Sequence, residues 1–281
     1  MTPLDAIIAP LGYGFFLRAL AASTVVGLVC AVVGSYMVLR GLAFMGDALS
    51  HSAFPGVVVA YLLKGPFYLG AAVAAVGTAL AIGWVTRRGR LRSDTTIGVL
   101  FAGMFALGVF LFSRIPNYVG DLFGFLFGEI LGIGDADLFA LTALAVIVLV
   151  VVAVFWKELL YSTFDPLGAA AAGLPVARLD YVLLAVIALT IVVSLQAVGI
   201  ILVVAMLVTP AAIGQLVATS FGRLVAVAIT VGVLSPVVGL YVSYWLDAAT
   251  GATIVLIETG LFVLALSFVT FRRRVQLPAK P

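Results

Sequence analysis

Apolar residues fill the sequence in long runs from about residue 15 to residue 271, and short polar breaks separate the runs. A helix that crosses a bilayer needs about 20 mostly apolar residues. Nine segments are long enough, and we predict them as membrane spans: 15–39, 42–63, 66–86, 95–113, 137–156, 180–198, 200–218, 224–245 and 252–271. The pattern therefore predicts an all-α integral membrane protein, a polytopic helical bundle of about nine spans.

Two places leave the number of spans open. Residues 115–134 are aromatic and glycine-rich and carry Asp121 and Glu129, which favours an interfacial or re-entrant segment over a further span. Two of the predicted spans meet at Gly199 with no polar break between them. Fusing or splitting segments at these places gives eight or ten spans, and eight is the alternative to the nine that we predict.

Composition supports this class of protein and excludes others. The chain is 64% hydrophobic and 10% charged, with a mean hydropathy of +1.31, whereas soluble domains carry about 25% charged residues. No polar linker divides the chain, so we predict one transmembrane domain over residues 1–281. The net charge of +3 is too small to indicate a nucleic-acid partner, and the single cysteine, Cys30, excludes an internal disulfide and a cysteine-rich metal site.

The positions of the basic residues predict an orientation. With nine spans and the N-terminus outside, Arg18, Lys64 and Arg114 lie on the outer side and the other twelve Lys and Arg residues on the cytoplasmic side. Such an excess is what the positive-inside rule expects. We therefore predict a multi-pass protein with its N-terminus outside and its C-terminus in the cytoplasm.

The stretch richest in chemistry is RGLAFMGDALSHSAFPG, residues 40–56, which contains His51, the only histidine of the chain. In a helix, Asp47 and His51 lie one turn apart on the same face. Pro55 follows His51 by four residues and has no amide hydrogen to donate to the His51 carbonyl. A carboxylate, an imidazole and a freed carbonyl thus gather at one point of a predicted span, which indicates a cation site on a pathway.

Energetics favour a cation at this place. An ionised carboxylate near the bilayer centre costs roughly 2.5–3.5 kcal/mol on insertion scales, and a divalent cation would offset that cost. Mixed oxygen and nitrogen ligands suit manganese, zinc or iron(II) better than copper(I). The alternative is that Asp47 and His51 bond each other or a neighbouring helix and hold the bundle together. Glu258, near the outer end of the last predicted span, is a further candidate for binding a metal or a proton.

Residues 157–180 form the longest predicted cytoplasmic connection and contain FDPLGAAAAGLP, residues 164–175. This pattern predicts a short helix with Asp165 as N-cap, Pro166 at the first helical position and Gly173 at its end. We interpret the segment as a docking element for another protein.

Residues 40–56 resemble the second-span signature of the permease subunit of bacterial ABC importers for manganese, zinc or ferrous iron. Further motifs resemble that family in the same order, so that the resemblance extends from about residue 12 to 271. The element Asp47–His51 (DALSH) is specific, and the other motifs are weaker individually. They are DTTIGVLF from Asp94, FGEILG from Phe127, FDPLG from Phe164 with GLP from Gly173, VGIILVVAMLVTPAA from Val198 and GATIVL from Gly251.

The resemblance implies a homodimeric permease of the bacterial cell (inner or plasma) membrane, surrounded by lipid. It implies two copies of a cytoplasmic ABC ATPase and an extracytoplasmic metal-binding protein as partners, with the metal ion as substrate and no permanently bound cofactor. By this resemblance Asp47 and His51 contact the metal, and residues 164–175 are the coupling helix that fits the ATPase. The matching coupling residues are Phe164, Asp165, Pro166, Leu167, Gly168, Gly173, Leu174 and Pro175. Because the chain has one histidine, any further ligand must be a carboxylate, a carbonyl, water or a group of the other protomer.

Two other classes of protein would use such residues. An ion-coupled secondary metal transporter would use Asp47 and His51 but needs no docking helix. An intramembrane metalloenzyme usually needs three protein ligands for its zinc, and the sequence has no His-Glu-x-x-His and no Walker A motif for ATP. We therefore expect a permease that is not itself an enzyme, with the secondary transporter as the alternative. A carboxylate and an imidazole do not show whether manganese, zinc or iron(II) is the substrate, because all three metals accept such ligands.

Overall fold

The structure, a computed structural model, describes residues 8–89, 92–115 and 130–276. Short connections join the helices, and no strand occurs within these ranges. In chain order the elements are α2 (Gly14–Leu39), α3 (Ala43–Ser52), α4 (Phe54–Leu62), α5 (Phe67–Arg88), α6 (Ser93–Phe112), the 3-10 turn η1 (Ile130–Gly132), α8 (Asp135–Val154), α9 (Trp156–Phe164), α10 (Pro166–Ala171), α11 (Val176–Val217), α12 (Phe221–Leu246) and α13 (Thr250–Gln276).

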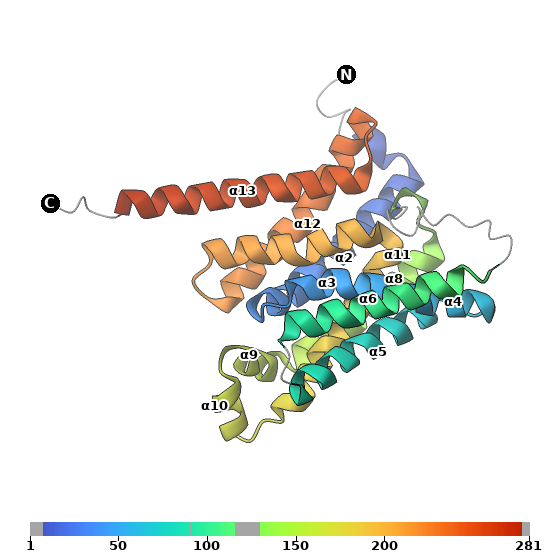
Figure 1. Cartoon of the computed structure of the whole chain (residues 1–281). Coiled ribbons are helices and arrows are strands. Elements are labelled where there is room, and N and C mark those ends of the chain that lie inside the picture. The colour runs from blue at the N-terminus through green and yellow to red at the C-terminus, as the bar shows by residue number, and fades with distance from the viewer. Residues whose placement is uncertain (1–7, 90–91, 116–129, 277–281) are drawn as a thin grey trace.

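Eight helical segments among the described residues are long and apolar enough to cross a membrane, and they agree within a few residues with eight of the predicted spans. The remaining predicted span, 42–63, is divided into α3 and α4, each of which is too short to cross alone. Together they extend along α5 and α6 (Figure 1). Ala53, which joins them, keeps helical dihedral angles of φ −69° and ψ −26°. The count of about nine spans is therefore consistent with a second span that is broken in the middle.

The predicted junction at Gly199 is a break within α11. Gly199 has φ +80° and ψ 167°, which interrupts the helical dihedral angles of the 42-residue element. Glycine adopts positive φ without the steric cost that a Cβ atom imposes, so this residue allows two spans to abut without a loop. The other uncertain segment, 115–134, lies mostly outside the described ranges, which leave out residues 116–129. Within its described end, the structure has the turn η1.

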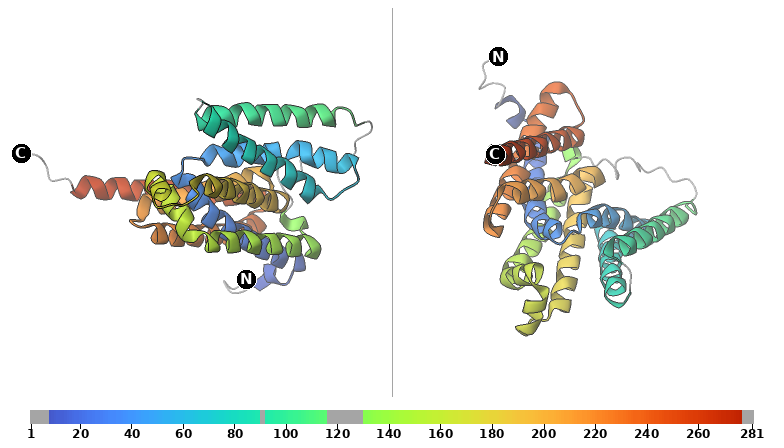
Figure 2. Two further views of the ribbon diagram at one scale, coloured as in Figure 1. Left: turned by 90° about the horizontal axis from the view of Figure 1, so that it is seen from below. Right: turned by 60° about the vertical axis from the view of Figure 1, so that its left-hand side comes forward.

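The helix α2 occupies the centre of the bundle and packs against α8, α11 and α12. The helices α5 and α6 lie on one side of this centre and α13 on the opposite side, as the right-hand view of Figure 2 shows. The short helices α9 and α10 lie together at one end of the bundle (Figure 1). The helix α3 packs against α11, α5 and α6, so the motif of residues 40–56 lies between the centre and one side.

A close backbone contact brings α2 and α12 together. A Cβ atom added at Gly27 would lie 1.9 Å from the carbonyl oxygen of Gly232. Without a hydrophobic driving force between helices in lipid, small residues at the interface allow the van der Waals packing that holds helices together.

We expect Gly27→Ala to destabilise the protein by about 1–3 kcal/mol, because the added methyl group forces the two backbones apart. Thermal unfolding of the purified protein in detergent measures the effect. Gly103→Ala is the matched control, since no atom outside its own helix lies within 4 Å of a Cβ atom added there. Equal melting temperatures for the two variants would contradict this account of the α2–α12 contact.

Candidate metal site

Asp47 and His51 lie on α3, which begins directly after a tight turn. Gly41, with φ +68°, forms the turn that follows α2, and the helix starts at Ala43. The Asp47 Oδ1 and His51 Nε2 atoms lie 3.5 Å apart, one turn from each other. The prediction that the two side chains share a helix face is therefore confirmed.

The two faces of α3 differ in their surroundings. Met45 and Leu49 are fully buried, and the helix packs against α11. On another face Phe44 is 76% exposed, and the side chains of Asp47 and His51 are 52% and 22% exposed. The polar pair thus lies on the face of α3 that the described part of this chain leaves partly open.

Aromatic rings of α6 bound the site on one side. The ring centroid of His51 lies 5.5 Å from that of Phe101 and 5.3 Å from that of Phe105, and the second pair is edge-on. These contacts restrict the orientation of the imidazole. The sequence did not indicate Phe101 and Phe105 as part of the site, because one aromatic residue per helical turn is common in an apolar span.

The pair supplies a carboxylate and an imidazole, and both are ligands of manganese, iron(II) and zinc. A complete site for such an ion takes at least four ligands. Among the described residues, no three His, Cys, Asp or Glu side chains come together so that they could hold a metal ion. Within the part of the chain that the structure describes, Asp47 and His51 are thus two side chains that could contribute to such a site without completing it.

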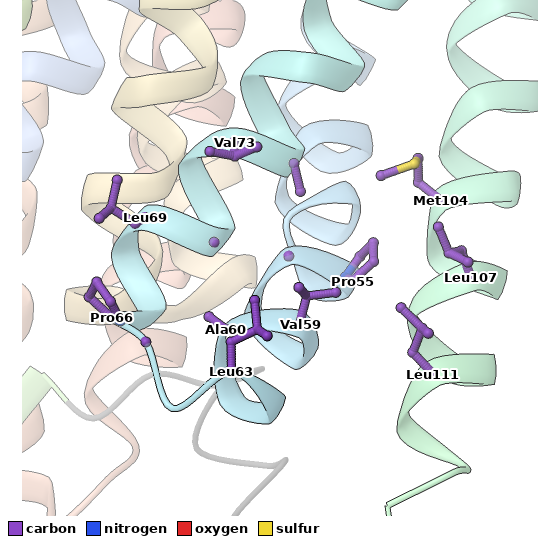
Figure 3. A pocket seen from close by; sticks show the side chains of 14 residues that line it. Pro55, Val59, Ala60, Leu63, Pro66, Leu69, Val73, Met104, Leu107 and Leu111 are labelled. Carbon is purple, nitrogen blue, oxygen red and sulfur yellow. The ribbon is translucent and has the colours of Figure 1, made fainter.

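The break between α3 and α4 falls where Pro55 was expected to interrupt backbone bonding, because α3 ends at Ser52 and Pro55 is in the first turn of α4. Beyond the break, α4, α5 and α6 enclose a pocket of about 460 Å³. Its labelled side chains, from Pro55 and Val59 to Met104 and Leu107, are all apolar (Figure 3). The side chains that line this pocket therefore offer no oxygen or nitrogen ligand to a cation.

Glu258 lies elsewhere in the bundle. It is fully buried in α13, and its Oε1 atom accepts a hydrogen bond of 3.1 Å from the Ser235 hydroxyl of α12. Its other oxygen, Oε2, is buried and has no hydrogen-bond partner among the residues that the structure describes. The helix α13 packs against α11 and α12, whereas α3 packs against α11, α5 and α6. The structure thus does not bring Glu258 into one cluster with Asp47 and His51.

The predicted cytoplasmic helix is α10, and its ends are as expected. Pro166 is its first residue, and the Asp165 side chain accepts a 2.8 Å hydrogen bond from the Gly168 amide. Gly173, with φ +85°, follows the C-terminal end. Leu167 is 83% exposed, an unusual position for a leucine at the end of the bundle that α9 and α10 occupy (Figure 1).

A polar network that the sequence did not predict lies beside α10. Arg40, the C-cap of α2, donates to Asp180 of α11 and to Ser162 and Thr163 of α9. Arg87 of α5 binds the other oxygen of Asp180. In the sequence these residues appeared only as charges and hydroxyls near span ends, because nothing in the chain order indicates that four helices meet there.

Comparison with known proteins gives a consistent result. The sequence matches the ABC 3 transport family over residues 12–269. It is 42% identical to the manganese transport system membrane protein MntC of Halalkalibacterium halodurans, over 92% of this chain and 88% of that protein. It is 43% identical to the chelated iron transport system membrane protein YfeD of Yersinia pestis, over 92% of this chain and 87% of that protein. The solved structure of PsaBC from Streptococcus pneumoniae in complex with Fab superposes with a TM-score of 0.83 and 36% identity, covering 93% of this chain and 94% of that one.

Proposed function

Because the chain belongs to the ABC 3 transport family, we propose that it is the permease subunit of an ATP-binding-cassette importer that carries manganese or iron(II) into the cytoplasm. The relatives described above are named for manganese and for iron. Zinc has compatible ligand chemistry and is the third metal to test. An ion-coupled secondary transporter, the alternative from the sequence, would also use Asp47 and His51, but the family match and the capped helix α10 favour the importer.

The observation that carries the proposal is the position of Asp47 and His51 on an open face of a membrane helix. Ionisable side chains at membrane depth face the interior of a bundle or a water-filled cavity, because exposure to lipid is costly. The 52% exposed side chain of Asp47 therefore needs a cover that the described part of one chain does not supply. A pathway along the axis of a dimer provides that cover.

A second copy of this chain also completes the ligand set. A two-fold axis places the same patch of both subunits in contact, so that two aspartates and two histidines would face each other across the axis. Four protein ligands of this kind satisfy a divalent transition metal. A homodimer would both supply the missing ligands and cover the open face of α3. We propose a homodimer on these two grounds.

We further propose that residues 164–175, with the capped helix α10, dock into a separate cytoplasmic ABC ATPase, two copies of which hydrolyse the ATP. An extracytoplasmic binding protein delivers the metal to the outer mouth. The family match supports a bacterial inner-membrane location. The excess of Lys and Arg on one side supports an orientation with the N-terminus outside and the C-terminus in the cytoplasm.

In this mechanism the chain performs no covalent chemistry. The ion leaves its binding protein and exchanges part of its hydration shell for the carboxylate of Asp47 and the imidazole of His51. Closure of the ATPase dimer moves the docked segments and switches the access of the site from the outer to the cytoplasmic side. Glu258 belongs to a separate place in the bundle, where its Oε2 atom, without a partner in the described part of the chain, offers a further contact for a cation or a proton.

Uptake by cells that lack their own importers for these metals tests the function. With the chain, its ATPase and its binding protein expressed together, we expect ATP-dependent accumulation of radioactive manganese or iron. Zinc is supplied in parallel at the same concentration. The metal that accumulates to the highest level is identified as the substrate. Cells without the ATPase are the control, because a secondary transporter would accumulate metal in them to the same extent and would contradict the proposal.

A further inference from the structure

We infer that Arg40 is a positioning residue that links the proposed docking segment to the helix that carries the metal ligands. The inference rests on the proposed function, because it assumes that residues 164–175 dock into an ATPase and that Asp47 and His51 contact the metal. It adds the structural connection between these two places within one chain.

The first step is the set of contacts that Arg40 makes. Its Nη1 atom lies 2.5 Å from Asp180 Oδ1 of α11. Its Nε atom donates to Thr163 Oγ1 at 2.9 Å and its Nη2 atom to Ser162 Oγ at 2.8 Å, both on α9. A guanidinium group carries its donors in a fixed planar fork, so Arg40 holds α9 and α11 in a defined relation to α2.

The residues that bond to Arg40 precede and follow α10 in the sequence. The helix α9 ends at Phe164 just before α10, and α11 begins at Val176 just after it. The helix α10 itself packs chiefly on α9 and α11. A displacement of α10 by a docked protein is therefore passed first to α9 and α11, where Ser162, Thr163 and Asp180 hold Arg40.

The second step leads from Arg40 to the metal ligands through a rigid turn. The Gly41 amide donates to the Val38 carbonyl at 3.0 Å, and the Leu42 amide donates to the Met37 carbonyl at 2.9 Å. With Gly41 at φ +68°, these bonds form a Schellman motif, which fixes the direction of the chain after a helix. The helix α3 starts directly afterwards, so its orientation depends on where Arg40 is held.

Asp180 also connects α5 to the same point. Its Oδ2 atom accepts from Arg87 Nη2, and the Arg87 guanidinium lies 5.9 Å from the centre of the Tyr181 ring. Because α5 packs beside α3 and α4, the network is connected to the helix of the proposed metal ligands through α5 as well as through the turn at Gly41. Hydrogen-bond and salt-bridge networks of this kind can carry energetic coupling between distant sites.

The test is the ratio of metal transported to ATP hydrolysed by the complete importer in proteoliposomes. We expect Arg40→Gln to lower this ratio by about 10-fold while ATP hydrolysis changes by less than about twofold, as for the loss of a typical coupling between sites. Arg40→Lys keeps the charge but lacks the fork for three acceptors on two helices, so its ratio falls as well. The control is Arg223→Gln, because among the described residues the Arg223 guanidinium bonds to Thr219, four positions earlier in the chain, and to no other helix.

The ratio separates coupling from stability. A variant that merely folds less well gives fewer complexes, each of which transports the usual amount of metal per ATP. If Arg40→Gln behaves in that way, or if Arg40→Lys restores the wild-type ratio, Arg40 is a structural clamp and the inference is wrong. Asp180→Asn, which removes the shared carboxylate and leaves the α9 contacts, is measured beside them, and a normal ratio there also overturns the inference. Failure of the wild-type complex to transport metal would instead contradict the proposed function.

Discussion

Asp47→Asn and His51→Gln should each abolish uptake of the transported metal while leaving the protein assembled in the membrane. Each change removes one of the two proposed ligands of a protomer, and in the proposed dimer it removes two at once. Loss of even an outer hydrogen-bond partner of a metal ligand typically costs about 10–100-fold in affinity, so we expect a fall of at least that size. Uptake of radioactive metal, with the amounts of permease and ATPase matched, measures the effect.

Ser50→Ala provides a control on the same helix. The Ser50 side chain is buried, and its hydroxyl bonds the Gly46 carbonyl of its own helix at 2.8 Å, so uptake should change little. Direct binding of Mn²⁺ to the purified permease, followed by electron paramagnetic resonance, adds a measurement that is independent of ATP. Normal metal binding by both variants, together with a lower melting temperature, would mean that Asp47 and His51 hold the bundle together.

Leu167→Asp should prevent the ATPase from assembling with the permease and thereby abolish uptake. Leu167 lies 83% exposed on α10, so its replacement disturbs few contacts within this chain. In the apolar centre of an interface, however, a buried carboxylate without a partner costs about 2 kcal/mol or more, which corresponds to an affinity lower by about 30-fold or more. Co-purification of the ATPase with the tagged permease measures the loss.

The matched control for Leu167 is Leu63→Asp at the other end of the bundle. Leu63 is 76% exposed and lies beside Lys64, on the side that the charge distribution predicts as external. This variant should purify with as much ATPase as the wild type does. Retention of the ATPase by Leu167→Asp would show that residues 164–175 are not the docking segment. That result would also contradict the proposed coupling through α10.

Most of the helical architecture was predictable because the bilayer imposes it. A spanning helix must be about 20 residues long and apolar, and all its backbone groups must bond within the segment. Eight spans therefore follow from hydropathy alone. Asp165, Pro166 and Gly173 likewise predicted the ends of α10, because capping depends on residues that are adjacent in the chain.

The second span shows where this reasoning stops. Its apolar length predicted a crossing, but the division into α3 and α4 at Ala53 required a structure. Pro55 indicated an interruption without giving its size, since the neighbouring helices decide how far a chain bends at a proline. The junction at Gly199 was visible as two abutting spans, and its positive φ became apparent only in three dimensions.

By itself the sequence determined the class of protein, eight of the spans, the helical spacing that places Asp47 and His51 on one face, and the resemblance to metal-importer permeases. These features depend on hydropathy, local spacing and short motifs. Only the tertiary structure decided that Asp47 and His51 lie on an open face, that Glu258 lies apart with Ser235, and that Arg40 joins α9 and α11 through Asp180. Such contacts join residues more than 20 and up to 140 positions apart in the sequence. Hydropathy does not indicate which faces of two helices meet, because within a lipid bilayer close packing and hydrogen bonding select those faces.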